Sequence, residues 1–376
     1  MTLTTHQEEI VQSVRTHLTD CCLIGRAGTG KSTCLKAIIE GVQNIILAAP
    51  THMAAGKVSE VTGKYCITLA SLLGKKKEID YTTGEVFFDP ADFVQTKSHY
   101  IVIDEAGMLS HADYKKLKIN YPNSRFLFVG DKGQLPPIND ESFCVFDYLK
   151  CYELLVNMRC GQGNQLFDLI ERLYETPEEE IPNFKFDFGG NVIEINEGML
   201  TKDDLVLTYT RKAREKYNTI IKGNTPISTD TKFIADENIN YDKFFEKYLL
   251  KNGTTFFPIK VEEKKIHIQG NEVINRVLTC RNFKDFKINF LEDRRHLDSY
   301  LNTLATKKEW KEFYKQKEKF PEVGLAYAMT THKAQGQSIE SPTIDVWDIL
   351  KINDPVLRKK CLYVALSRAS ESLKIL

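Results

Sequence analysis

Apolar and polar residues follow two different rhythms along the first part of the chain. Short, almost uninterrupted apolar runs predict buried strands, and segments in which apolar residues recur every three or four positions predict helices. Strands that are apolar throughout and feed helices are typical of a parallel sheet covered on both faces, so an α/β domain is expected here. The strands are expected at 21–25, 44–50, 100–106 and 125–131, and the helices at 10–18, 31–42, just after 51 and near 110–119.

The same pattern returns later in the chain, in two pieces. A strand is expected at 203–210, where it feeds a helix over 211–221. The acidic, proline-marked stretch at 174–182 predicts an exposed crossover that leads to this second α/β domain. The remainder of the domain is expected at 323–338, 343–350, 355–368 and 373–376.

Two segments break the α/β pattern. Residues 75–98 contain "KKKEIDYTTGEVFFDP", whose alternating residues around a Thr-Gly turn predict a projecting β-hairpin. The alternative is a disordered surface insertion, since Lys75–Lys77 is a solvated charge run. The second break, at 225–320, predicts a small β-rich domain, because 254–269 alternates like antiparallel strands and 304–320 resembles a charged helix.

Composition narrows the class of protein. Lys plus Arg equals Asp plus Glu at 51 each, so the formal net charge is zero and any nucleic-acid binding has to come from a local groove. No apolar run approaches the length of a membrane span, and the polar N-terminal segment does not resemble a secretory signal. The nine cysteines form no CxxC pair, which predicts free thiols in a reducing, cytoplasmic compartment and no structural zinc.

A phosphate-binding loop is the first chemical motif. "GRAGTGKST" places two glycines, Gly25 and Gly30, around four residues and follows them with Lys31 and Ser32. The motif lies after an expected strand and before an expected helix, as a P-loop requires. Backbone N–H groups and the helix N-terminus bind phosphates, Lys31 reaches the β- and γ-phosphates, and the Ser32 hydroxyl coordinates Mg²⁺.

Two further strand ends carry residues suited to ATP hydrolysis. "VIDEA" places Asp104 and Glu105 at the end of an apolar strand. Asp104 is expected to hold Mg²⁺ through its water shell, and Glu105 to orient and deprotonate the attacking water. In "VGDKGQLPPI", Gln134 is expected to hydrogen-bond the γ-phosphate. A glutamate at this place favours hydrolysis over phosphate transfer to an acceptor.

Three classes of P-loop protein remain to be distinguished. A small-molecule kinase explains the P-loop but leaves Glu105, Gln134 and the second α/β domain without a role. A GTP switch is disfavoured because no NKxD guanine-reading motif occurs. A motor uses all of these features, and its track is either DNA or RNA.

Ten motifs in order give the chain a marked family resemblance. "LTTHQEEIV", "GRAGTGKST", "LAAPTHMAA", "TLASLLG", "VIDEAGML", "VGDKGQLPPI", "VNMRC", "LTYTRKA", "YAMTTHKAQGQS" and "LYVALSRA" resemble the superfamily-one helicases, specifically the RecD-like branch that includes phage helicases. The resemblance covers 1–160 and 323–376 well, 203–218 moderately and 220–320 weakly. It implies an ATP-dependent DNA helicase, with ATP and Mg²⁺ as cofactors, that moves 5′-to-3′ on single-stranded DNA as a monomer.

The resemblance also implies a domain layout. Two RecA-like domains in tandem would each carry an insertion: a β-hairpin pin in the first and an SH3-like β-rich module in the second. A bacterial host cytoplasm and a single-strand-binding or replication protein as a partner are further implications. The expected boundaries are 1–74 and 99–160 for the first domain, 75–98 for the pin, 161–224 and 321–376 for the second domain, and 225–320 for the module.

Site residues are carried over motif by motif. Gln7 matches the adenine-reading glutamine, Arg159 and Arg368 match two arginine fingers, and Gln335 with Gly336 matches the link between γ-phosphate and track. The P-loop residues expected to contact nucleotide are Gly25, Ala27, Gly28, Thr29, Gly30, Lys31, Ser32 and Thr33. The residues expected along the DNA are Pro50, Thr51, His52, Thr68, Ser71, Thr331, His332 and Lys333, with Tyr81, Phe87 or Phe88 stacking at the strand junction. A helix N-cap is the alternative role for Thr51.

Overall fold

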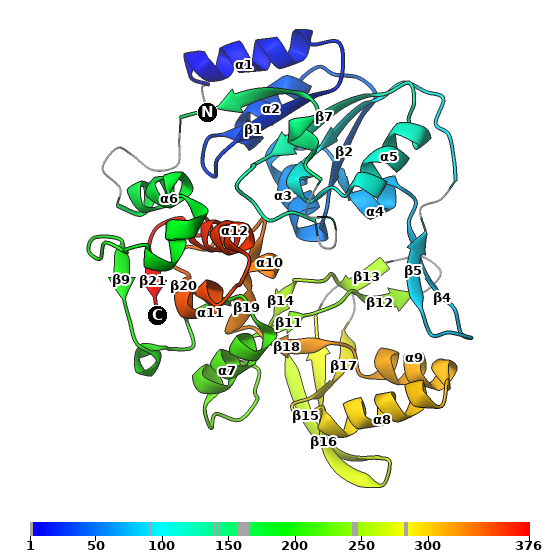
Figure 1. The fold of residues 1–376 in the computed structure, drawn as a ribbon. Helices are drawn as coiled ribbons and strands as arrows, with labels where there is room; N and C mark the ends of the chain where they lie inside the picture. The colour runs from blue at the N-terminus through cyan, green and yellow to red at the C-terminus, as the bar shows by residue number, and fades with distance from the viewer. Residues whose placement is uncertain are drawn as a thin grey trace. The chain divides into compact units, whose positions relative to one another are not determined.

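The computed structural model describes residues 3–89, 92–137, 140, 143–156, 165–242, 247–281 and 285–376. The chain divides into two compact units. Unit one comprises Met1–Lys76, Pro90–Tyr217 and Ala328–Leu376, and unit two comprises Lys77–Asp89 and Asn218–Tyr327. Figure 1 shows the elements of each unit.

A six-stranded parallel sheet in the order β3-β2-β6-β7-β1-β8 forms the first lobe of unit one. Strands β1 and β7 are uniformly buried except for one end residue, as expected for a sheet covered on both faces. The strands are β1 (Cys21–Gly25), β2 (Ile45–Ala49), β3 (Cys66–Thr68), β6 (Tyr100–Ile103), β7 (Arg125–Gly130) and β8 (Lys150–Leu154).

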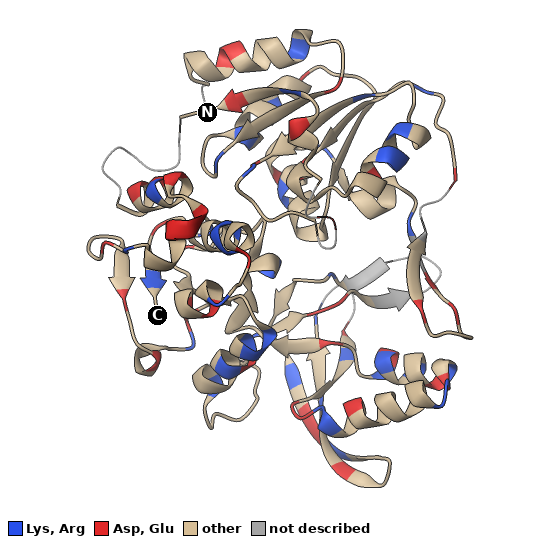
Figure 2. Ribbon diagram, in the orientation of Figure 1, with Lys and Arg blue, Asp and Glu red and all other residues tan. Residues whose placement is uncertain are grey.

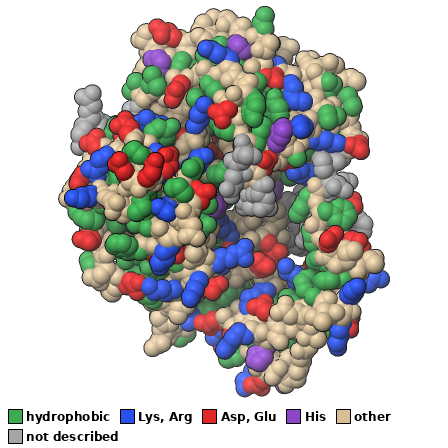
Figure 3. Space-filling view, viewed as in Figure 1, with side chains coloured by type: hydrophobic (Ala, Val, Ile, Leu, Met, Phe, Trp, Pro, Cys, Tyr) green, Lys and Arg blue, Asp and Glu red, His purple; other side chains and the backbone are tan. Residues whose placement is uncertain are grey.

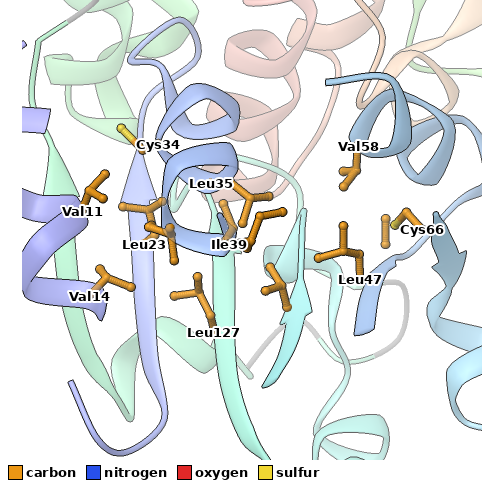
Figure 4. Packing of buried hydrophobic residues seen from close by; sticks show 14 of the residues in the cluster. Val11, Val14, Leu23, Cys34, Leu35, Ile39, Leu47, Val58, Cys66 and Leu127 are labelled. Atoms are coloured by element: carbon orange, nitrogen blue, oxygen red, sulfur yellow. The ribbon is translucent and has the colours of Figure 1, made fainter. Parts of the chain in front are cut away.

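Helices cover both faces of this sheet. One face packs against α1 (Thr5–Thr16), α2 (Lys31–Ile39) and α3 (His52–Thr62), and the other against α4 (Leu69–Leu72) and α5 (His111–Asn120). Figure 4 shows side chains of α1 and α2 pointing toward Leu23 and Leu127 of the sheet. Alternate residues of β1 enter the two cores, so each strand anchors both layers of helices. Two short 3₁₀ turns complete the lobe, η1 (Ala106–Met108) and η2 (Val145–Asp147).

The second lobe of unit one is a five-stranded parallel sheet in the order β19-β10-β20-β21-β9. In helix α12 the run Cys361–Leu366 is buried throughout. The strands are β9 (Val192–Glu194), β10 (Val206–Thr208), β19 (Ala328–Thr330), β20 (Thr343–Ile344) and β21 (Leu373–Ile375). The helices are α6 (Gln165–Glu175), η3 (Glu178–Asn183), η4 (Glu197–Met199), α7 (Arg211–Lys222), α10 (Thr331–Ala334), α11 (Val346–Leu350) and α12 (Pro355–Leu366).

Unit two is antiparallel and β-rich. Its sheets are β14-β11-β18, β12-β13, β15-β16-β17 and the hairpin β4-β5. Its two cores are built by β11, β16 and β17, and by β16 with α8. The bounds are β4 (Lys76–Ile79), β5 (Val86–Asp89), β11 (Phe233–Ala235), β12 (Ile239–Asp242), β13 (Lys247–Leu250), β14 (Thr255–Phe256), β15 (Lys260–Ile268), β16 (Asn271–Cys280), β17 (Phe286–Leu291), α8 (Arg295–Thr306), α9 (Trp310–Lys319) and β18 (Val323–Leu325).

The expected fold class is confirmed, since both α/β lobes are parallel sheets and the hairpin and the β-rich insertion are present. The expected single charged helix at 304–320 is wrong. Two helices, α8 and α9, lie there, and between them Lys308 adopts φ 59°, a left-handed conformation that ends a helix. No glycine or proline marks this break, so the sequence carried no signal for it.

The expected start of the first helix, at residue 10, is also wrong. Helix α1 begins at Thr5, because the hydroxyl of Thr4 accepts from the backbone N–H of Gln7 and the Gln7 side chain accepts from the N–H of Thr4. This reciprocal capping box stabilises a first turn that has little apolar periodicity of its own.

Charge is mixed over the molecule. Figure 2 shows basic residues along α7 and acidic ones at η3, which begins with Glu178, Glu179 and Glu180. On the face drawn in Figure 3, side chains of both signs are interspersed and no extended field of one sign forms. None of the helices in the described residues is long and apolar enough to cross a membrane.

Candidate nucleotide and nucleic-acid sites

The phosphate-binding loop runs from the end of β1 at Gly25 to the start of α2 at Lys31. Gly28 and Gly30 both have φ 87°, a left-handed conformation that favours glycine. A Cβ at Gly25 would lie 2.5 Å from the Thr29 Oγ1, so a side chain does not fit there. The glycines therefore hold the backbone in the tight curve that turns N–H groups toward a phosphate.

The positively charged side chain of the loop, Lys31, is bound by backbone carbonyls of the loop itself. The ammonium of Lys31 donates to the carbonyls of Gly25, at 2.6 Å, and Arg26, at 2.9 Å. Ser32 is exposed in the first turn of α2, followed by a half-buried Thr33. An ammonium and a hydroxyl at a helix N-terminus form an anion-binding surface with one oxygen available to a cation.

Gln7 connects α1 to this loop. Its Nε2 donates to the Thr29 carbonyl at 3.2 Å while its Oε1 accepts from the N–H of Thr4 at 3.0 Å. The side chain is 5% exposed, so both ends of the amide bind within the chain. Adenine reading by Gln7 remains a prediction, and the amide keeps a second N–H and a second acceptor site for a bond to the base.

Two carboxylates lie at the end of β6. Burial, and then the charge of Glu105, raise the pKa of Asp104 above its usual range, while Lys31 and Lys57 lower it. Glu105 has φ 51°, a left-handed conformation that costs free energy for a residue with a side chain. Among the described residues, none forms a hydrogen bond with its buried Oε2. An unpaired carboxylate oxygen on strained backbone needs a donor such as water, and this suits the role expected of Glu105.

Residues of the second lobe reach this site. The Nε2 of Gln335, just after α10, donates to the Oε1 of Gln134 at 3.1 Å, and both amides are buried. At the adjacent Gly336, with φ 79°, a Cβ would lie 4.0 Å from the Oε1 of Glu105. The structure thus brings Gln134 of the first lobe close to Gln335 and Gly336 of the second, and Gly336 close to Glu105.

Several residues at this interface were missed from the sequence. The hydroxyl of Tyr363 in α12 donates to Asp131 at 2.7 Å and accepts from the N–H of Ala27 at 3.3 Å. The Arg26 guanidinium pairs with the Glu171 carboxylate and lies 4.0 Å from the centroid of the Tyr174 ring. These residues lie inside or near the motifs named above, but a motif does not predict which residue each of its side chains will contact.

Lys57 of α3 was also missed. Its ammonium donates to the Gly336 carbonyl at 3.4 Å and to the Ser338 hydroxyl at 3.3 Å. These bonds connect α3 to the second lobe. The N-terminal end of α3 belongs to the segment that is expected to run along the DNA.

Of the two expected arginine fingers, the structure describes only Arg368. Arg368 is 5% exposed and donates to the Val364 and Gln337 carbonyls and the Ser367 hydroxyl. It is therefore held by its own lobe at the end of α12. Arg159 lies outside the described residues.

Among the residues of the first lobe that are expected to contact DNA (the track residues), the two threonines are helix caps. The Thr51 hydroxyl caps α3 by accepting from the N–H of Ala54 at 3.1 Å, as the alternative interpretation predicts. The Thr68 hydroxyl likewise accepts from the N–H of Ser71 at 3.1 Å and bonds its hydroxyl at 2.8 Å. Capping orients these N-termini, whose remaining N–H groups are suited to phosphate binding. The neighbouring Pro50 and His52 are half-buried and Ser71 is exposed.

The track residues of the second lobe differ in exposure. Thr331 is fully buried and its hydroxyl donates to the Thr208 carbonyl at 3.1 Å, so in this structure its side chain holds α10 to β10 and is not presented to a ligand. His332 is half-buried beside Tyr209, at 6.0 Å between ring centroids, and burial lowers its pKa. A neutral imidazole suits a base or sugar more than a phosphate. Lys333 is half-buried.

The hairpin of unit two packs against α9. The Tyr81 ring meets the Tyr314 ring edge-on at 6.2 Å, and the Tyr314 hydroxyl donates to the Gly84 carbonyl at 2.7 Å. A Cβ at Gly84 would lie 2.3 Å from the Trp310 ring, so the turn requires glycine. Phe87 and Phe88 are 36% and 55% exposed, which leaves both rings accessible.

The residues present fit a magnesium nucleotide. Among the described residues, no cluster of three or more His, Cys, Asp or Glu side chains could hold a metal by itself. Mg²⁺ typically binds one or two carboxylates together with water and substrate phosphates, so an all-protein cage is not required. The Ser32 hydroxyl at the phosphate loop, and the Asp104 carboxylate, which interacts with the charge of Lys31 from that loop, are the groups that such a partial site would use.

Sequence comparisons agree with this geometry. The AAA domain family matches residues 2–145. The chain is 25% identical over 410 residues to the ATP-dependent DNA helicase dda of Enterobacteria phage T4, covering 92% of this chain and 91% of that protein. It is 34% identical over 122 residues to the ATP-dependent RecD2 DNA helicase of Deinococcus radiodurans, covering 31% of this chain and 16% of that protein.

Solved structures share the fold. Bacteroides Pif1 bound to single-stranded DNA superposes with a TM-score of 0.55 at 17% identity, covering all of this chain and 92% of that one. A structure of two coordinating Pif1 helicases at forked duplex DNA gives a TM-score of 0.56 at 18% identity, again covering all of this chain and 92% of that one. These likenesses agree with the resemblance of the ordered motifs to superfamily-one helicases of the RecD-like and Pif1-like kind, and the solved structures show that the chain shares their fold.

Proposed function

We propose that the protein is an ATP-dependent DNA helicase that moves 5′-to-3′ along single-stranded DNA and opens duplex DNA ahead of it. The observation that carries the proposal is the buried bond between Gln134 and Gln335, whose neighbour Gly336 lies near the Glu105 carboxylate. A phosphate-sensing amide of one lobe is thereby joined to the motif of the other lobe that is expected to contact DNA. Closing and opening of this junction would couple hydrolysis to movement.

Each residue has a chemical role in this proposal. Lys31 and the loop amides bind the triphosphate, and Ser32 with Asp104 holds the magnesium ion, which supplies charge neutralisation of the phosphates when bound. Glu105 orients the attacking water and takes its proton, and Gln134 contacts the γ-phosphate. Arg368 and Arg159 complete the positive charge around the transferring phosphoryl group.

The proposed DNA track uses backbone N–H groups more than basic side chains. The capped N-termini of α3 and α4 supply phosphate donors in the first lobe, and His332 with Lys333 supplies contacts in the second. Such contacts need no net positive charge, which agrees with equal numbers of acidic and basic residues. We infer that a monomer suffices, because both proposed arginine fingers belong to the same chain. We place its activity in the cytoplasm, that of a bacterial host if the source is a phage. A single-strand-binding or replication protein is the partner class to test first.

ATPase and unwinding assays test the proposal. Purified protein should hydrolyse ATP much faster with single-stranded DNA, and it should open a duplex with a 5′ tail but not one with a 3′ tail. Unwinding from a 3′ tail alone would reverse the proposed polarity. Stronger stimulation by RNA than by DNA would instead identify an RNA motor, and phosphate on an acceptor in place of water would identify a kinase.

Strand separation is assigned to the hairpin. Replacing Phe87 and Phe88 with Ala removes the two accessible rings while Tyr81, which packs on Tyr314, stays in place. Unwinding should fall and DNA-stimulated ATPase should persist, since base stacking at the junction is lost and the nucleotide site is untouched. Loss of both activities would assign the rings to folding instead.

A further inference from the structure

One tyrosine hydroxyl links three segments of unit one. Tyr363 of α12 is 1% exposed, and its hydroxyl contacts both the Asp131 carboxylate and the Ala27 N–H. Ala27 belongs to the phosphate loop, and Asp131 follows β7 at the start of the loop that carries Gln134. A residue of the second lobe is therefore hydrogen-bonded to both nucleotide loops of the first.

The ring of Tyr363 is also built into this junction. At Gly133 a Cβ would lie 2.9 Å from the Tyr363 ring and 2.8 Å from the Tyr174 ring, so the loop carries glycine where the two rings press against it. The ring centroids of Tyr174 and Tyr363 are 5.4 Å apart, and the Arg26 guanidinium lies over the Tyr174 ring. Helices α6 and α12 thus contact the phosphate loop and the loop after β7 through aromatic rings as well as hydrogen bonds.

The Asp131 carboxylate depends on the tyrosine. It is 2% exposed, and among the described residues it accepts from the Tyr363 hydroxyl on one oxygen and from the Gly133 N–H, at 2.9 Å, on the other. A buried charge without donors is costly, so the pair is held together when the lobes meet. Burial and the charge of Asp131 raise the pKa of Tyr363, which keeps the hydroxyl protonated as a donor.

We propose that Tyr363 is a positioning residue that fixes the second lobe on the phosphate loop and thereby places Arg368 for hydrolysis. Arg368 directly follows the C-terminal turn of the helix that carries Tyr363, and it is bound to the Val364 carbonyl of the same turn. A shift of this turn against Asp131 and Ala27 would move the guanidinium with it. This inference rests on the proposed ATPase function and adds a residue to it.

The test is Tyr363→Phe, which keeps the ring and removes both hydrogen bonds. The DNA-stimulated kcat should fall by about 10-fold, the order of magnitude expected when these hydrogen bonds are lost, while the KM for ATP changes by less than about twofold. The affinity for ADP with aluminium fluoride should fall, and the affinity for ADP should not. A double-mutant cycle with Asp131→Asn should show non-additive effects on kcat.

The matched control is Tyr217→Phe. Tyr217 is 2% exposed and its hydroxyl donates to Asp345 at 2.8 Å, so it is a similar buried pair that lies wholly within the second lobe. Its loss should lower Tm comparably but leave kcat near wild type. An unchanged kcat in Tyr363→Phe, or an equal loss in Tyr217→Phe, would overturn the inference. A wild-type protein without DNA-stimulated ATPase would instead overturn the proposed function on which the inference rests.

Discussion

The two lobes of unit one contribute to the nucleotide site in different ways. The first lobe supplies a continuous strand, loop and helix from Gly25 onward, whose shape is set by backbone conformations at Gly28 and Gly30. The second lobe supplies single side chains, Gln335 and Tyr363, that meet the first lobe through individual hydrogen bonds. The shape of the first lobe's part of the site is thus set by local backbone geometry. The second lobe's part depends on individual hydrogen bonds that can be made and broken.

The largest expected effect comes from removing charge supplied by the second lobe. Arg368→Ala should lower kcat by about 10³-fold or more and keep nucleotide affinity, because an arginine finger acts on the transferring phosphoryl group. Single-turnover hydrolysis and fluorescent-nucleotide binding measure the two quantities. Arg358→Ala is the control, since that arginine of α12 donates to the Ile352 and Asn353 carbonyls. Near-normal turnover without Arg368 would remove it from the site. The same substitution at Arg159 is expected to behave alike.

Within the first lobe, Glu105→Gln should lower kcat by about 10²- to 10³-fold while ATP still binds, because an amide cannot accept the proton of water. The same change should not lower Tm, since it removes a like charge beside Asp104 and neutralises a buried oxygen without a partner. Steady-state kinetics and thermal unfolding give the two readouts. A catalytically normal variant would leave the hydrolytic role to another residue.

A smaller effect is expected at the amide junction. Gln335→Ala removes the buried bond to Gln134 and should reduce the stimulation of ATPase by DNA by about 10-fold, with less effect on the basal rate. Gln337→Ala serves as the control, because that side chain donates to the Lys333 carbonyl in its own lobe. The ratio of stimulated to basal kcat is measured. If DNA stimulation falls equally in the two variants, the loop after α10 as a whole, and not the bond between Gln134 and Gln335, would be responsible.

The smallest effect is a pH dependence of magnesium binding. Burial and Glu105 raise the pKa of Asp104 to about 7, so the metal-free protein loses stability as pH rises through this value and an ionised carboxylate accumulates. A bound cation favours the ionised form. Mg²⁺ with ATP should therefore raise Tm by about 2 °C more at pH 8 than at pH 6. Thermal unfolding of Asp104→Asn should lose this difference, and a larger gain at pH 6 would contradict the assigned pKa direction.

Local patterns in the sequence predicted much of this molecule. The phosphate loop, the strand ends at Asp104 and Asp131, and the hairpin turn at Gly84 each depend on a few neighbouring residues, and each is present in the structure. The split between α8 and α9 was not predictable, because Lys308 carries no signal for a left-handed conformation. The sequence also gave no indication that Thr331 is buried, since burial depends on which strands lie beside it.

The sequence by itself indicated the family resemblance, the two parallel sheets and the chemical groups available for ATP hydrolysis, because hydrophobic periodicity and motif spacing are local properties of the chain. Only the tertiary structure decided which groups meet. It paired Gln134 with Gln335, placed Tyr363 between Asp131 and Ala27, and committed both ends of the Gln7 amide to the chain itself. Such pairings join residues far apart in sequence, and their energies depend on burial and on hydrogen-bond geometry that exist only once the sheets have packed.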